Sequence, residues 1–151
     1  MERKLIQLLA TFFYAGYLPL APGSMASLAG AGICILLRSS FNLYLLLFVI
    51  ISAIGFAVSG KMEKMQNDKD PSCVVIDEVA GSFIAFFMLP ATWPVFITAY
   101  FLFRAFDMFK IFPANKFESF GGSLGIMSDD LVAGLYTNLI MNMALWIIKI
   151  F

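Results

Sequence analysis

The sequence predicts an all-α, multi-pass integral membrane protein with about four hydrophobic passes and an N-terminal interfacial helix. Its 151 residues are 61% hydrophobic and 13% charged, against about 45–50% and about 25% in ordinary soluble domains. A chain of this length has too little interior to bury so much apolar surface, which includes 17 Phe residues. No linker-like stretch divides it, so we expect a single domain over residues 1–151.

The N-terminal part predicts an interfacial helix followed by a helical hairpin. Met1-Glu-Arg-Lys precedes an apolar stretch that lacks a convincing cleavage site, so we expect this stretch to remain in the mature protein. Ser24–Leu37 is apolar and rich in small residues, which allow close helix packing. Phe41–Ser59 carries no charge and, at about 28 Å as a helix, is long enough to cross a membrane. Arg38-Ser-Ser supplies the short polar link between them.

The C-terminal part predicts a polar loop and further apolar segments. The charged stretch that begins at Lys61 ends in the turn signal Asp70-Pro-Ser, as expected for a loop at a membrane face. Residues 73–103 are apolar and are interrupted by Pro90-Ala-Thr-Trp-Pro94, which predicts two short helices, either as full crossings or as a re-entrant hairpin. Leu131–Phe151 predicts a terminal span.

The basic residues predict the orientation of the chain. Arg38 stands opposite the others if these all face one side, which the positive-inside rule makes cytoplasmic. The others are Arg3, Lys4, Lys61, Lys64, Lys69, Arg104, Lys110 and Lys116. This arrangement also places nearly every carboxylate on the cytoplasmic face, as a site there would require.

Composition also excludes several classes of function. The net charge is zero and no basic patch is present, which argues against nucleic-acid binding. The absence of histidine excludes histidine-dependent phosphatases, serine triads and histidine metal sites. Cys34 and Cys73 match neither a disulfide framework nor a metal-binding spacing. The hard oxygen ligands that remain favour Mg²⁺.

Asp77 and Glu78 interrupt an apolar helix, where a charge costs several kcal/mol unless it meets a polar cavity, a partner or a metal. We interpret them as functional. The alternative is that both lie above the interface, in water.

Arg104, Asp107 and Lys110 recur at helical spacing and form one polar stripe. Such a stripe suits a phosphate, because Arg supplies a planar fork, Lys a point charge and Asp a metal ligand. The alternative is an ion pair between Arg104 and Asp107 beside a snorkelling Lys110.

Ser128-Asp129-Asp130 is predicted to begin the last helix, where acidic residues are ordinarily explained by helix capping. The preceding Gly-rich segment from Gly121, with Gly122 and Gly125, suggests instead a loop whose N–H groups bind a phosphate beside a metal. Together these groups predict metal-assisted phosphoryl transfer.

Four blocks of sequence closely resemble the phosphatidylglycerophosphatase A family. They are Gly16-Tyr-Leu-Pro-Leu-Ala-Pro-Gly-Ser24, Asp70-Pro-Ser-Cys-Val-Val-Ile-Asp-Glu-Val-Ala-Gly81, Phe103-Arg-Ala-Phe-Asp-Met-Phe-Lys110 and Gly125-Ile-Met-Ser-Asp-Asp-Leu-Val-Ala-Gly134. The resemblance implies a Mg²⁺-dependent enzyme of the bacterial inner membrane, with its active site on the cytoplasmic side, that converts phosphatidylglycerophosphate to phosphatidylglycerol and phosphate.

The family's motifs fall on the residues selected above. They are Asp77, Glu78, Arg104, Asp107, Lys110, Asp129 and Asp130. The resemblance does not assign their roles; our hypothesis puts the metal on Asp77, Asp129 and Asp130, with Glu78 as the base. The sequence departs from the family at Pro22-Gly-Ser-Met-Ala26, at Lys110-Ile-Phe-Pro113 and at Gly122-Ser-Leu-Gly125. The last departure bears on how closely that segment can approach a phosphate.

Two rival functions remain open from the residues alone. Intramembrane acidic residues also occur in small transporters or channel subunits, which would carry flux without releasing phosphate. A non-catalytic assembly factor would use Asp and Arg only to hold helices together. For the phosphatase we expect a phospholipid substrate and the membrane as partners, and no nucleic acid. The sequence does not indicate an oligomeric state or an acyl-chain preference.

Overall fold

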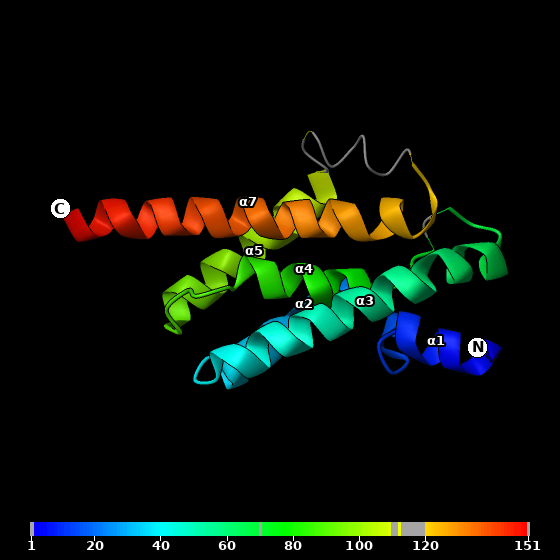
Figure 1. Cartoon of the computed structure of the whole chain (residues 1–151). Helices are drawn as coiled ribbons and strands as arrows, with labels where there is room; N and C mark the ends of the chain where they lie inside the picture. Colours follow the sequence, from blue (N-terminus) through cyan, green and yellow to red (C-terminus); the bar gives the residue numbers. More distant parts are fainter. Residues whose placement is uncertain (1, 70, 110–111, 113–119, 151) are drawn as a thin grey trace.

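A computed structural model describes residues 2–69, 71–109, 112 and 120–150 of the chain. Within these ranges the regular elements are all helical, and the all-α prediction is confirmed (Figure 1). In chain order they are α1 (Arg3–Ala10), the 3₁₀ turn η1 (Ala15–Tyr17), α2 (Pro22–Leu37), α3 (Phe41–Gln66), α4 (Ile76–Ala85), α5 (Trp93–Phe109) and α7 (Gly122–Ile150).

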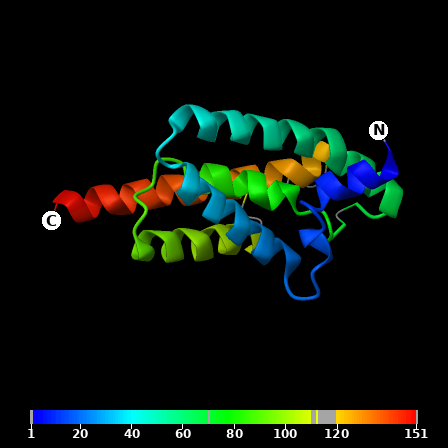
Figure 2. The ribbon, with the colours of Figure 1, turned by 90° about the horizontal axis from the view of Figure 1, so that it is seen from below.

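The short helix α4 lies at the centre of the bundle. It contacts α2, α3, α5 and α7, and Figures 1 and 2 show these helices arranged around it. Eight of its ten residues are buried, so α4 is apolar around most of its circumference, as a core helix should be. Asp77 and Glu78 in its first turn are the exception.

Two glycines bring α4 and α7 into backbone contact. A Cβ on Gly81 would lie 2.7 Å from the carbonyl oxygen of Asp130, and one on Gly134 would lie 2.4 Å from the carbonyl oxygen of Gly81. The two helices run in the same direction (Figure 1). Residues one turn before each glycine, Asp77 and Asp130, therefore lie on the same side of the crossing.

The C-terminal end of α4 is also inside the bundle, where its last carbonyl groups would otherwise lack partners. The Tyr44 hydroxyl donates to the carbonyl oxygen of Phe83, and the Asn138 side-chain amide donates to those of Ala85 (3.3 Å) and Phe87 (2.8 Å). These bonds let a helix of only ten residues end in the core.

Two described helices are long and apolar enough to cross a membrane, Phe41–Gln66 and Gly122–Lys149. Most of their residues face outward, which suits a membrane-associated protein. The expected four passes are therefore too many for the described residues. α2, α4 and α5 have 16, 10 and 17 residues, fewer than the roughly 18 or more that indicate a span.

Two helix boundaries predicted from the sequence are wrong, the end of α3 and the start of α7, and the same packing accounts for both. α3 continues past Ser59 to Gln66, through residues predicted as a loop, and α7 begins at Gly122 instead of near Leu131. The extended ends pack together: Met62 is buried, and the backbone N–H of Gly60 donates to the Ser123 hydroxyl at 2.8 Å. Tertiary contact thus stabilises helical turns that their polar and glycine-rich sequence does not favour.

Candidate active site

A cavity of about 300 Å³ lies at the N-terminal end of α4. It is lined by the start of α2, the turn before α4, and side chains of α4, α5 and α7. Its lining residues are Ala21, Pro22, Gly23, Ser24, Pro71, Ser72, Val74, Asp77, Glu78, Arg104, Asp107, Asp129 and Asp130. The structure thus gathers six of the residues selected from the sequence, as predicted. A seventh, Lys110, lies outside the described residues.

Three carboxylates in this cavity are close enough to share one cation. One oxygen from each of Asp77, Glu78 and Asp130 lies within 4.8 Å of the others. This group differs from the predicted one, because Glu78 takes the place of Asp129. Asp129 still lines the cavity.

The side chains of this acidic group are shielded from solvent. Asp77 is 5% exposed and Asp130 3%, so the alternative in which Asp77 lies in water is wrong. Burial raises the pKa of Asp77, and the nearby carboxylates of Glu78 and Asp130 raise it further. Burial also raises the pKa of Glu78. Ionised carboxylates so close together in a low-dielectric site need a compensating positive charge.

The donor atoms of the acidic group fit a hard divalent cation. Glu78 Oε2 and Asp130 Oδ1 are buried and have no hydrogen-bond partner among the described residues. Unpartnered buried oxygen atoms are unfavourable unless something else binds them. An all-carboxylate ligand set suits Mg²⁺, Mn²⁺ or Ca²⁺ better than softer metals.

Arg104 on α5 lies beside the acidic group and lines the same cavity. Its guanidinium pairs with Asp107 at 2.5 Å, lies 3.9 Å from Glu78 Oε1 and donates to the Ser27 hydroxyl at 3.2 Å. The Arg104–Asp107 ion pair of the alternative is therefore present, while its second part, Lys110, lies outside the described residues. The pair nevertheless lines the cavity, and Arg104 Nε has no partner among the described residues. A donor held in this way can bind an anion.

Ser27 was missed in the sequence, since a serine among small residues reads as packing. It lies one turn after Gly23, on the α2 face that lines the cavity. Its hydroxyl also donates to the Gly23 carbonyl oxygen at 2.7 Å. The four-residue interval from Gly23 to Ser27, which puts both on one helix face, was the signal in the sequence that could have identified Ser27.

Gly122 and Gly125 do not form the predicted loop. Gly122 begins α7 and Gly125 lies in its first turn. A Cβ on Gly122 would lie 3.9 Å from Glu63 on α3, and neither glycine lines the carboxylate cavity. The helix-capping alternative for Ser128-Asp129-Asp130 is also wrong, because α7 starts more than a turn earlier.

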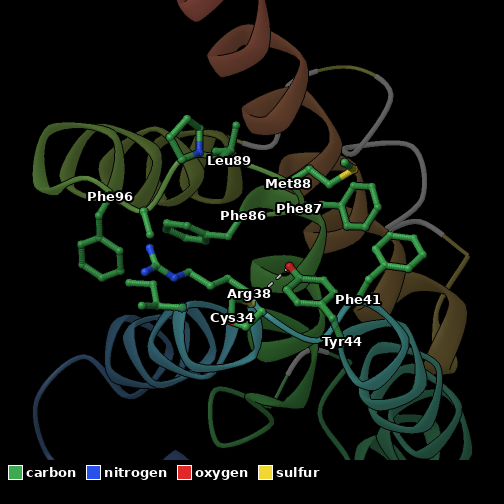
Figure 3. A pocket seen from close by; sticks show the side chains of 13 residues that line it. Cys34, Arg38, Phe41, Tyr44, Phe86, Phe87, Met88, Leu89 and Phe96 are labelled. Carbon is green, nitrogen blue, oxygen red and sulfur yellow. Dashed lines mark hydrogen bonds between the residues drawn. The ribbon is translucent and has the colours of Figure 1, made fainter.

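A second cavity, of about 530 Å³, lies at the other end of α4 (Figure 3). It is lined mainly by aromatic and aliphatic side chains, and Arg38 is the only charged residue among them. Figure 3 shows Arg38 reaching in beside Phe86 and Phe96, while Tyr44 meets Cys34. No carboxylate is among the described residues that line this cavity, whereas five line the first one.

Comparison with known proteins supports the resemblance seen in the sequence. The sequence model of the phosphatidylglycerophosphatase A family matches residues 8–145. Proteins of that name from Haemophilus influenzae and Escherichia coli are 32% and 34% identical, covering 90% and 85% of this chain and 86% and 76% of their own lengths.

A third relative carries a different name. A Bacteroides thetaiotaomicron protein with the provisional name phosphatidylinositol-3-phosphatase is 34% identical, over 93% of this chain and 94% of its own length. No solved structure matches. With nearly the whole chain matched, this protein belongs to the phosphatidylglycerophosphatase A family and is an enzyme, a phosphatase.

Proposed function

We propose that this protein hydrolyses the terminal phosphate monoester of phosphatidylglycerophosphate in the carboxylate cavity, with Mg²⁺ as its metal. The observation that carries the proposal is the buried group of Asp77, Glu78 and Asp130, within 4.8 Å of one another and beside Arg104. A cation on one side and a carboxylate group on the other suit a metal and a phosphate bound next to each other. The family membership supports the substrate.

In the proposed mechanism each described residue has a separate task. Asp77, Glu78 and Asp130 would hold the metal, which when bound supplies positive charge to the phosphate oxygens and favours ionisation of water. Arg104 binds and stabilises the phosphate oxygens, while Asp107 and Ser27 keep its guanidinium in place. Asp129 accepts the proton of the attacking water as the new P–O bond forms and the P–O bond to the lipid breaks in line with it. The leaving alkoxide takes up a proton from Asp129 or from solvent and departs as the lipid alcohol.

This assignment changes the earlier hypothesis in one respect. Glu78, first taken as the base, moves to the metal because of its position in the acidic group, and Asp129 becomes the base. Lys110 keeps its predicted role on the phosphate, although it lies outside the described residues. Gly122 and Gly125 have no role in the proposal.

We further propose that the enzyme resides in the bacterial inner membrane, crosses it several times and has its cavity on the cytoplasmic side. The outward-facing apolar residues of α3 and α7 support contact with lipid. A phospholipid would then enter the cavity laterally from the leaflet.

Phosphatidylinositol 3-phosphate is the second candidate substrate, because of the name of the Bacteroides relative. Both lipids present a phosphate monoester, and the carboxylate group does not distinguish between them. The experiment therefore measures phosphate release by the detergent-purified protein from each lipid, with Mg²⁺ or with chelator.

We expect release from phosphatidylglycerophosphate that requires Mg²⁺ and is lost in a folded Asp130→Asn variant. Faster release from phosphatidylinositol 3-phosphate would make that lipid the proposed substrate and leave the mechanism unchanged. No release from either lipid by a folded native protein would reject both proposed substrates. Flux in liposomes without phosphate release would restore the transporter alternative, which family membership does not favour.

A further inference from the structure

The carboxylate cavity has a second wall of opposite chemical character. Facing its acidic residues are the first turn of α2 (Ala21–Ser24) and the turn before α4 (Pro71–Val74). Their cavity-lining residues carry no charged side chain and offer two hydroxyls, of Ser24 and Ser72, together with the N–H groups of Gly23 and Ser24. The cavity thus has an acidic wall and a donor wall.

The start of α2 leaves its first N–H groups available. Pro22 occupies the first helical position and has no N–H, so these groups are the N–H groups of Gly23 and Ser24. Ala21 before it is in the left-handed region (φ 44°) and supplies no side-chain cap. The N–H groups of a first helical turn have no partner within the helix, and the helix dipole adds partial positive charge there. No hydrogen bond of the Ser24 hydroxyl is present in the described part of the chain.

Gly23 sets how closely this turn approaches the acidic wall. A Cβ at this position would lie 2.1 Å from Glu78 Oε1 and 3.4 Å from Arg104 Nη2. The backbone of α2 therefore reaches both the acidic group and the arginine without an intervening side chain. A ligand at this turn would also be within reach of both.

An independent observation indicates that the cavity binds something. Asp130 is 3% exposed and its Oδ1 is unpartnered among the described residues, although it lines the same cavity. A buried carboxylate oxygen without a donor points to a cation at the acidic wall. A phosphate oxygen could then lie between that cation and Arg104, both of which attract an anion.

We propose that the donor wall, formed by the first turn of α2 with the Ser24 and Ser72 hydroxyls, is the binding site for the phosphate monoester of the substrate. It rests on the proposed function and extends it, because it assigns the phosphate to Pro22–Ser24 instead of to the glycines of α7. The ester phosphate lies beside this wall and Arg104, and its free oxygens accept hydrogen bonds from the Ser24 and Ser72 hydroxyls and the Ser24 N–H.

The test compares single hydroxyl changes at the two ends of α2. Ser24→Ala removes a donor at the proposed site, Ser24→Thr keeps it, and Ser39→Ala, in the second cavity, is the control. For each purified full-length variant we would measure KM, inhibition by inorganic phosphate and the Mg²⁺ concentration for half activity. Inorganic phosphate is the probe because it carries the group without the lipid.

We expect Ser24→Ala to raise KM and the phosphate inhibition constant by roughly 10-fold, the size of one hydrogen bond to a charged group. Ser24→Thr and Ser39→Ala should remain near the native values, and the Mg²⁺ requirement should not change. An unchanged phosphate inhibition constant in Ser24→Ala would overturn the assignment. So would an equal shift in the Mg²⁺ requirement, because Ser24 would then act through the carboxylates.

Failure of the proposed function would be recognised separately. If the native protein released no phosphate from either lipid, calorimetric titration of inorganic phosphate in the presence of Mg²⁺ would use the same variants. Binding weakened by Ser24→Ala alone would support the phosphate site without the reaction. Absence of phosphate binding by the native protein would reject the site.

Discussion

The two ends of α4 lie in the same bundle and have opposite chemistry. Its first turn carries Asp77 and Glu78 into a cavity with further carboxylates, and its last turn leads to Phe86 and Phe87 in an aromatic cavity. α2 lines both, with Gly23 at one end and Cys34 at the other, separated by about 16 Å at the helical rise.

The comparison shows which cavity requires a functional explanation. Filling a cavity wall with Phe and Leu is favourable, and such a wall would be present with or without a ligand. Collecting buried carboxylates is unfavourable unless a cation offsets their repulsion. The larger cavity is therefore the less informative one. The predictions below test this difference, from the largest expected effect to the smallest.

Asp130→Asn should have the largest effect. We expect phosphate release to fall by roughly 1,000-fold, because the variant loses a metal ligand and with it the charge that stabilises the transition state. Native protein at 100 times its Mg²⁺ dissociation constant should gain about 2.7 kcal/mol of stability. Asp130→Asn should lose this gain, as measured by thermal unfolding with and without Mg²⁺.

Asp129→Asn is the matched neighbour of that change. As the proposed base, its loss should reduce turnover by roughly 100-fold or more but keep the stabilisation by Mg²⁺. If Asp129→Asn lost the stabilisation as Asp130→Asn does, the originally predicted metal ligands Asp77, Asp129 and Asp130 would be favoured over those proposed here.

Arg104→Lys should reduce kcat/KM by roughly 100-fold, since Lys keeps the charge but loses the planar fork that binds two oxygens. The protein should remain folded, because a cation still faces Asp107 and Glu78. Steady-state kinetics with a circular dichroism control would check this. Unchanged kcat/KM would show that Arg104 acts only as the ion-pair partner of Asp107.

Gly23→Ala and Gly32→Ala place the same methyl group on the same helix. At Gly23 the Cβ meets Glu78 at 2.1 Å, whereas at Gly32 it meets nothing within 4 Å. We expect Gly23→Ala to lower turnover by about 10-fold through displacement of the Glu78 carboxylate. Gly32→Ala should keep activity and stabilise the helix by about 0.5–1 kcal/mol, measured by chemical denaturation. Equal activity of the two variants would contradict the close approach at Gly23.

Arg38→Gln, in the aromatic cavity, should have the smallest effect. Arg38 is exposed and forms no ion pair among the described residues, so stability should change by less than about 0.5 kcal/mol. Phosphate release should stay within about 2-fold of native in the same assay. A loss comparable to that of Arg104→Lys would show that the aromatic cavity takes part in the reaction.

The sequence identified which residues belong to the candidate site, but it did not show which of them lie close enough to share one cation. Asp77, Glu78 and Asp130 stood out because carboxylates are rare in apolar segments. Both Asp77 and Asp130 also precede a glycine by one turn, Gly81 and Gly134, and this repeated spacing was a signal of a helix crossing that brings the two carboxylates together.

Other features were not accessible from local pattern. The ends of α3 and α7 are helical where they pack together, with Met62 buried and the Gly60 N–H bonded to the Ser123 hydroxyl. The Gly-rich segment was interpreted as a loop for the same reason: glycine favours a loop when the chain is considered without its neighbours. Its contact with Glu63 is visible only in three dimensions.

The sequence by itself determined an all-helical, apolar chain, its family and the carboxylates and arginine available for chemistry. These properties follow from composition, periodicity and residue type, which need no neighbours. The tertiary structure decided which carboxylates lie close enough to share one cation, which helix start lies beside them and which helices are long enough to span a membrane. These depend on the crossing of α4 with α7 and on the approach of α2, both set by packing between residues distant in sequence.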